Sequence, residues 1–262
     1  MLINFSKYQG TGNDFVIIDL INDDWVDRKL IEQNVEHLCD RRYGVGADGL
    51  IIIDREDDYD FRMIYYNSDG KQSSMCGNGG RCAAHFYYSY VNDKAEISFI
   101  AIDGPHLAKI DGKKISLQML DVSETKSLEK AYELNTGSPH YVRENEEELS
   151  EQAFRDAAIK VRYSEAYKEE GINVNFYNEV NNKLRVTTYE RGVEDLTFSC
   201  GTGVTAVAMA YGIKNKLEGN QDISISTKGG DLSVSYKKNK NNFTNVWLSG
   251  PAVESFKGIV EL

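Results

Sequence analysis

Short apolar runs alternate with turn-forming residues along most of the chain, a pattern typical of β-strands joined by tight turns. Strands are predicted for Phe61–Tyr66, Ile172–Tyr177 and Leu184–Tyr189. Hairpin turns are predicted at Asp111-Gly112, Asn181-Asn182 and Gly229-Gly230. The chain is therefore expected to consist largely of antiparallel sheet.

Helical spacing of apolar residues is limited to four segments of the chain. They are Asp27–Cys39, the stretch after Cys76, about Ser150–Val161 and the stretch after Cys200. Many strands with few helices indicate the α+β class.

The two halves of the chain share a weak repeat. The first half opens with Gly10-Thr11-Gly12-Asn13 and the second with Asn135-Thr136-Gly137-Ser138, and each later reaches a Cys-Gly-x-Gly turn. Gly12 and Cys76 are 64 residues apart, and Gly137 and Cys200 are 63 apart. We predict two copies of one unit, a first domain of residues 1–118 that carries Cys76 and a second of 119–251 that carries Cys200. The acidic stretch 121–133 is expected to connect them.

Charge and composition narrow the class of protein. The net charge of −11 over 262 residues argues against a nucleic-acid partner. No apolar run is long enough to cross a bilayer, and the first residues do not resemble a signal peptide. We therefore expect a cytoplasmic protein with no membrane partner. Its four cysteines should be free thiols, and no CxxC pair or histidine cluster suggests a zinc site.

Cys76 and Cys200 each open a predicted helix and are followed by glycines. The positive end of a helix favours a thiolate, and the free N–H groups of the first turn can bind a carboxylate. Two such sulfurs on opposite sides of one carbon could invert it, because a thiolate removes a proton from one face and a thiol delivers one to the other. We therefore predict an enzyme in which Cys76 and Cys200 form an acid and base pair. Cys39 and Cys82 lie inside predicted helices and are expected to be core residues.

Five motifs together resemble diaminopimelate epimerase. They are Gly10-Thr11-Gly12-Asn13-Asp14-Phe15, Arg42-Tyr43-Gly44-Val45-Gly46-Ala47-Asp48-Gly49, Met75-Cys76-Gly77-Asn78-Gly79-Gly80-Arg81-Cys82, Glu190-Arg191-Gly192 and Ser199-Cys200-Gly201-Thr202-Gly203. The resemblance implies two pseudo-symmetric domains, each a curved antiparallel-rich sheet around a central helix. It also implies that the last strand, about 252–262, completes the first domain.

The resemblance implies a specific activity, the interconversion of LL- and meso-2,6-diaminopimelate in the lysine and peptidoglycan precursor pathway. Members use neither pyridoxal phosphate nor a metal, and they commonly form homodimers. By the same resemblance, Cys76 and Cys200 are the catalytic thiols. The substrate would be bound by Asn13, Asn67, Gly77, Asn78, Asn173, Glu190, Arg191, Gly201 and Thr202.

Other positions leave alternatives open. His140 and Glu190 resemble a pair thought to adjust the thiol pKa values, although a lone histidine such as His140 could equally be structural. Gly49 and Ser138 stand where many members carry Gln and Asn, so a related racemase for another amino acid is a second hypothesis. A third, from a different class, is a binding protein in which Cys76 and Cys200 act as a redox-sensing thiol pair.

Overall fold

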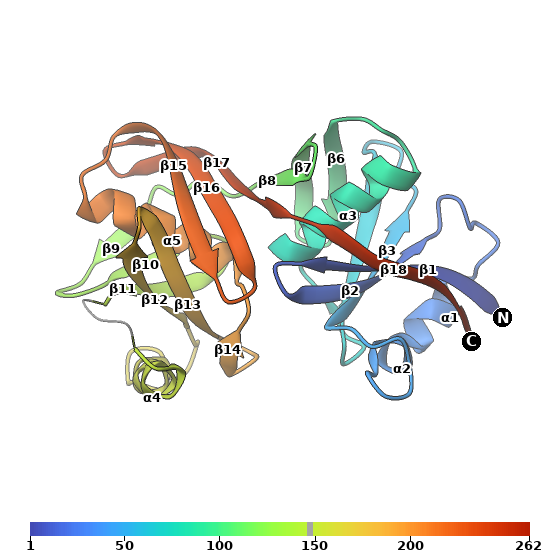
Figure 1. The fold of residues 1–262 in the computed structure, drawn as a ribbon, viewed down its shortest axis with the longest axis horizontal. Coiled ribbons are helices and arrows are strands. Elements are labelled where there is room, and N and C mark those ends of the chain that lie inside the picture. The colour runs from blue at the N-terminus through green and yellow to red at the C-terminus, as the bar shows by residue number, and fades with distance from the viewer. Residues whose placement is uncertain (146–148) are drawn as a thin grey trace. The chain divides into compact units, whose positions relative to one another are not determined.

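The computed structural model describes residues 1–145 and 149–262, and the chain forms two compact units (Figure 1). One consists of Met1–Leu117 and Gly250–Leu262, and the other of Gln118–Ser249. In the described residues, strands far outnumber helices, which confirms the predicted α+β class. None of the described helices is both long and apolar enough to cross a membrane.

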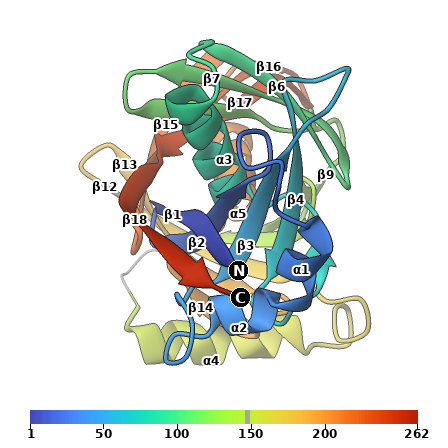
Figure 2. The same ribbon diagram turned by 90° about the vertical axis from the view of Figure 1, so that its right-hand side faces the viewer.

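The first unit is built mainly from strands of the N-terminal half, with one strand from the end of the chain. Its elements are β1 Leu2–Gly10, β2 Asn13–Asp19, α1 Arg28–Gln33, α2 Val35–Cys39, β3 Gly49–Asp54, β4 Phe61–Asn67, β5 Gln72–Ser73, α3 Gly77–Tyr90, β6 Glu96–Ala101, β7 Gly104–Asp111, β8 Lys114–Gln118 and β18 Val253–Glu261. β1 pairs antiparallel with β18 from Leu2 opposite Glu261 to Gln9 opposite Val253. The two termini consequently lie side by side (Figure 2).

The second unit repeats this arrangement with two exceptions. Its elements are β9 Thr125–Ser127, β10 Tyr132–Asn135, β11 Pro139–Glu144, α4 Glu151–Arg162, β12 Asn173–Val180, β13 Lys183–Glu190, β14 Asp195–Thr197, α5 Gly201–Lys214, β15 Gly219–Thr227, β16 Gly230–Asn239 and β17 Asn242–Pro251. The exceptions are that β9, which pairs with β10 as β18 pairs with β1, comes first in the chain, and that one helix, α4, replaces α1 and α2. Strand register repeats as well: β2 pairs parallel with β3, placing Phe15 opposite Gly49, and β11 pairs parallel with β12, placing His140 opposite Asn173. The two units are therefore copies of one topology, as the repeat in the sequence predicts.

The core of each unit surrounds a helix that begins directly after a cysteine. In the second unit, the residues of α5 from Val204 to Ala210 are fully buried and pack against the strands. In the first unit, α3 packs on one face of β3 and α1 with α2 on the other, so Gly49–Ile53 is buried on both sides. Burial on both faces explains the uninterrupted apolar run in β3.

Two local predictions were wrong. The helix expected over Asp27–Cys39 is divided into α1 and α2 at Asn34, whose Nδ2 donates to the Leu30 carbonyl at 2.8 Å. A side chain that bonds a helix carbonyl in this way competes with the backbone pattern. The stretch 121–133, expected to be a connection, instead contains β9 and the start of β10. Its polar composition is explained by the exposure of most of β9.

Candidate active site

Cys76 is the residue immediately before α3 and has an extended backbone, with φ −84° and ψ 130°. Its carbonyl accepts the Gly80 N–H at 2.7 Å, which starts the helix. The glycines that follow are required by packing, because a Cβ at Gly79 would lie 3.3 Å from Ile51 Cδ1 and one at Gly80 would lie 2.8 Å from Met75 Sδ. The sulfur is half-buried and is thus placed at the positive end of a tightly packed helix.

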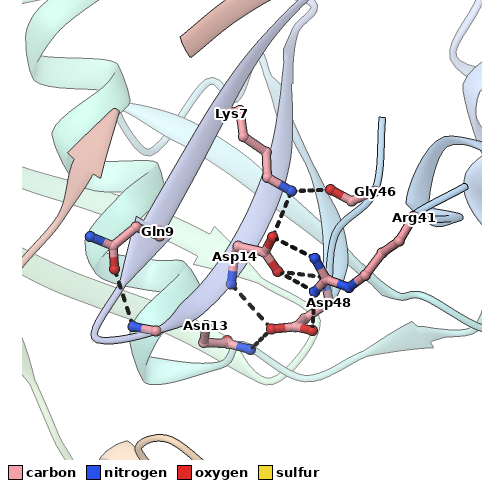
Figure 3. Close-up of polar contacts among 8 residues, drawn as sticks. Lys7, Gln9, Asn13, Asp14, Arg41, Gly46 and Asp48 are labelled. Carbon is pink, nitrogen blue, oxygen red and sulfur yellow. Dashed lines mark hydrogen bonds and ion pairs between the residues drawn. The ribbon is translucent and has the colours of Figure 1, made fainter. Parts of the chain in front are cut away.

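Asn13 is the predicted substrate-binding residue that the structure places against Cys76. The Cys76 Sγ lies 3.7 Å from Asn13 Oδ1, and Asn13 Nδ2 donates to Asp48 Oδ2 at 2.9 Å. Figure 3 shows that Asn13 follows the β1–β2 turn and points toward the Asp48 carboxylate. One predicted substrate residue and one predicted catalytic residue of the first unit are thus in contact.

Behind Asn13 lies a group of charged side chains (Figure 3). Asp14 forms ion pairs with Lys7 at 2.7 Å and Arg41 at 2.7 Å, and Arg41 also pairs with Asp48 at 2.7 Å. Burial alone would raise the pKa of the Asp14 carboxyl, but hydrogen bonds from Arg41 and Lys7 outweigh it and lower that pKa. The Asp14 carboxyl therefore remains ionised and paired with both cations at neutral pH.

Asn78 and Arg81 are both buried under the first turn of α3. Asn78 Oδ1 accepts hydrogen bonds from Arg81 Nη2 at 2.9 Å and from Thr11 Oγ1 at 3.3 Å. The side-chain oxygen of Asn78 is thus used in hydrogen bonds within the unit. The backbone N–H groups of Gly77 and Asn78 remain the groups suited to bind a carboxylate.

Cys200 occupies the matching position before α5 but is more deeply buried, with 7% of its surface exposed. Its sulfur accepts the Gly203 N–H at 3.4 Å and lies 3.5 Å from Thr202 Oγ1. The Thr202 carbonyl accepts a hydrogen bond from Thr136 Oγ1 at 2.8 Å, which ties the turn to the β10–β11 loop.

His140 is fully buried near this turn, on β11. Burial lowers the pKa of His140 to about 3, and the neighbouring Arg191 acts in the same direction. His140 Nδ1 lies 3.0 Å from Asn175 Nδ2, and Asn175 Oδ1 accepts from Thr188 Oγ1 at 2.9 Å. At neutral pH the imidazole is therefore uncharged.

The sequence interpretation overlooked Asn175. A Cβ at Gly203 would lie 2.5 Å from Asn175 Oδ1 and 3.3 Å from Cys200 Sγ, so this amide adjoins the sulfur of the second unit. The sequence does contain a signal for it. Residues i and i+2 of a strand share a face, and Asn173, two positions earlier, is a predicted substrate-binding residue.

Asn173, Glu190 and Arg191 meet at one end of β12 and β13. Asn173 Nδ2 donates to Ser138 Oγ at 2.8 Å, and its Oδ1 accepts the Arg191 N–H at 2.9 Å. Burial raises the pKa of the Glu190 carboxyl. In the first unit, Asn67 lies exposed at the matching end of β4, opposite Gly49.

The remaining cysteines lie where the sequence interpretation expected them. Cys39 and Cys82 are buried, and burial raises the pKa of each thiol to about 12. In the described part of the chain, no three His, Cys, Asp or Glu side chains are grouped as metal ligands would be.

Comparison with known proteins identifies relatives along nearly the whole chain. The family model described as diaminopimelate epimerase matches residues 5–121 and 132–254. The diaminopimelate epimerase of Flavobacterium psychrophilum is 46% identical over 248 residues, 94% of this chain and 95% of that protein. The one from Aquifex aeolicus is 34% identical, and the match covers 98% of this chain and 97% of the relative.

Solved structures with low sequence identity share the fold. A phenazine biosynthesis protein of the PhzF family from Bacillus anthracis is 12% identical, with a TM-score of 0.75 and all of both chains covered. A hydroxyproline epimerase from Agrobacterium vitis, solved with bound trans-4-hydroxy-L-proline, is also 12% identical, with a TM-score of 0.67. That match covers 99% of this chain and 91% of the other.

Proposed function

Since the chain belongs to the diaminopimelate epimerase family, we propose that it performs the epimerisation with Cys76 and Cys200 as its two proton-transferring groups. The enzyme is an isomerase of lysine biosynthesis that converts LL-2,6-diaminopimelate to the meso form. The observation that carries the assignment of the thiols is their shared position, directly before the buried helix of each unit.

The reaction needs one group to remove the Cα proton and another to return a proton to the opposite face. In one direction a cysteine thiolate takes the proton, and the electron pair left on Cα is delocalised into the adjoining carboxylate. The first-turn N–H groups, at Gly77 and Asn78 on α3 and at Gly201 and Thr202 on α5, are suited to stabilise that charge. The thiol of the other cysteine then protonates Cα and becomes the thiolate. The reverse direction exchanges the two roles.

We assign recognition of the remainder of the substrate to Asn13, Asn67, Asn173, Glu190 and Arg191. Arg191 can pair with the distant carboxylate, and Glu190 can accept from its ammonium group. The contacts of Asn173 with Ser138 and with the Arg191 backbone support a positioning contribution, because they hold the Arg191 loop against β12. We also assign to His140 and Glu190 the adjustment of the thiol pKa values.

The thiol assignment is tested by incubating the enzyme with LL-diaminopimelate in D₂O under reducing conditions. We expect meso product that carries deuterium at one Cα, and a loss of at least about 100-fold in rate for Cys76→Ser and for Cys200→Ser separately. Cys39→Ala is the matched control, because that thiol lies in the core of the first unit.

The same experiment separates the other hypotheses. A racemase for another amino acid would leave LL-diaminopimelate unlabelled, and a redox-sensing thiol pair would leave both serine variants as active as the wild type once reduced. Either outcome would remove the proposed assignment.

We further propose that the enzyme is cytoplasmic and homodimeric. A reducing compartment would keep both thiols available for proton transfer. β18 exposes the apolar side chains Val253, Phe256 and Ile259, which supports a contact with a second copy. Analytical ultracentrifugation should give twice the chain mass, and a monomer at micromolar concentration would contradict the dimer.

A further inference from the structure

Two aspartates of the glycine-rich motifs have no assigned function in the reaction. Asp48 Oδ2 accepts the Asn13 side-chain amide at 2.9 Å and the Asp14 backbone N–H at 3.2 Å. Its other oxygen accepts from Arg41 Nη2 at 2.7 Å, and Asp14 in turn pairs with Lys7 and Arg41 (Figure 3). Asp48 is therefore held from two sides while it contacts Asn13.

This arrangement decides which way the Asn13 amide faces. An ionised carboxylate only accepts hydrogen bonds, so Asn13 must turn its Nδ2 toward Asp48. Its carbonyl oxygen is consequently the atom that faces the Cys76 sulfur, at 3.7 Å. A thiol can donate to that oxygen, whereas a thiolate has no proton to donate and is repelled by it.

We propose that Asp48 is a positioning residue for Cys76: by accepting the Asn13 amide it holds a carbonyl oxygen against the sulfur and favours the protonated thiol. The proposal deepens the assigned function and rests on it only in giving this thiol a catalytic purpose. Cys200 is in the opposite situation, because its sulfur accepts the Gly203 N–H at 3.4 Å, and such a bond favours a thiolate. The two matching turns thus offer their sulfurs different hydrogen-bond partners.

Other groups near Cys76 act on the same proton. On α3, the buried Arg81 guanidinium attracts a Cys76 thiolate, while Cys82 is a neutral thiol whose pKa burial raises to about 12. At the β6–β7 turn, Asp103 accepts the Met75 N–H at 3.1 Å and contacts His106 at 3.3 Å. A test must therefore separate the effect of amide orientation from the effect of charge.

The experiment measures alkylation of the free, reduced enzyme by iodoacetamide across pH, with mass spectrometry of the Cys76 and Cys200 peptides. The midpoint of each profile reports the ionisation of one thiol and does not depend on its accessibility. In Asp48→Asn, the new side chain keeps its oxygen toward Arg41, because the bond from this cation at 2.7 Å is stronger than the bond from the Asp14 N–H at 3.2 Å, which the variant gives up. Its NH₂ then faces Asn13, which reverses and offers Nδ2 to Cys76. We expect the Cys76 midpoint to fall by about one pH unit, about a tenfold rise in thiolate below the midpoint, with Cys200 unchanged.

Two further variants isolate the pathway. Asp103→Asn removes a carboxylate near Cys76 that does not touch Asn13, and it should move the midpoint by less than a third as much. In an Asn13→Ala background there is no amide to reverse. Asp48→Asn should then shift the Cys76 midpoint no more than Asp103→Asn does. If the full shift persists without Asn13, or if Asp48→Asn leaves the Cys76 midpoint unchanged, the proposal is overturned.

The test also works if Asp48→Asn does not fold. Asn13 lies half-buried after a hairpin turn, and Asn13→Ala alone should lower the Cys76 midpoint because it removes the acceptor. An unchanged or raised midpoint would again overturn the proposal. Failure of the assigned function would look different, since active serine variants would refute catalysis by the thiols without altering these midpoints.

Discussion

Asn175 Nδ2 lies 3.0 Å from His140 Nδ1, and this contact decides which nitrogen of the buried imidazole carries the proton. The Asn175 oxygen is already occupied by the Thr188 hydroxyl, so the amide must donate to His140. His140 Nδ1 is therefore the acceptor, and the proton resides on Nε2, a buried atom without a partner among the described residues. The second unit thus contains a neutral, buried imidazole N–H donor.

The depressed pKa of His140 predicts how stability depends on pH. The native imidazole stays neutral down to about pH 3, whereas the unfolded chain binds a proton below about pH 6.5. The unfolded chain therefore gains a proton that the native protein does not bind. The free energy of unfolding is not affected by this group above pH 6.5, and it falls as the pH drops from there toward 3, by at most about 1.4 kcal/mol per pH unit. Urea unfolding at several pH values measures this dependence. The free energy of unfolding should vary less with pH in His140→Gln than in the wild type, while His37→Gln, at an exposed position, should match the wild type.

Glycine is required more strictly at the start of α5 than at the matching position of α3. A Cβ at Gly203 would lie 2.5 Å from Asn175 Oδ1, whereas at Gly79 the nearest atom is the end of the Ile51 side chain at 3.3 Å. We expect Gly203→Ala to lower the free energy of unfolding by about 2 kcal/mol and to reduce activity severely, and Gly79→Ala to cost less than half as much. Equal losses in thermal unfolding would contradict this asymmetry.

Gly49 is required by the packing of β3 on β4. A Cβ there would lie 2.6 Å from both the Tyr65 ring and the Tyr66 carbonyl oxygen, so a side chain at this position cannot be accommodated without movement of β4. Gly49→Ala should destabilise the protein by about 1–3 kcal/mol. Gly112→Asn is the control, because no atom lies near its Cβ and asparagine tolerates the left-handed φ of 58°. A Gly49→Ala variant as stable as the control would refute the packing argument.

Burial separates the two core thiols from the proposed catalytic pair. The pKa of Cys39 and of Cys82 is raised to about 12, so neither should react with iodoacetamide in the native protein at pH 8. Cys76 and Cys200 should be labelled before these two, and all four cysteines should react once the chain is unfolded. Peptide mapping would check this order, and early labelling of Cys82 would contradict it.

The sequence by itself determined the features that depend on neighbouring residues. Alternation and turn residues located β4, β12 and β13, and the hairpin at Asn181-Asn182 has the positive φ angles that asparagine tolerates. The cysteine motifs located the starts of α3 and α5, and the helical spacing over about Ser150–Val161 located α4. These features are set within a few residues by backbone sterics and side-chain size.

The tertiary structure alone decided which distant residues meet. Asp48 reaches Asn13 because β2 and β3 pair in a parallel register, and Asn175 reaches His140 because β11 and β12 do the same. The pairing of β1 with β18 joins residues from opposite ends of the chain. Local preferences cannot specify such contacts, since a register shift of one residue would turn each of these side chains to the other face of its sheet. In the assembled units, ion pairing then keeps the Asp14 carboxyl charged, and burial keeps the His140 imidazole neutral.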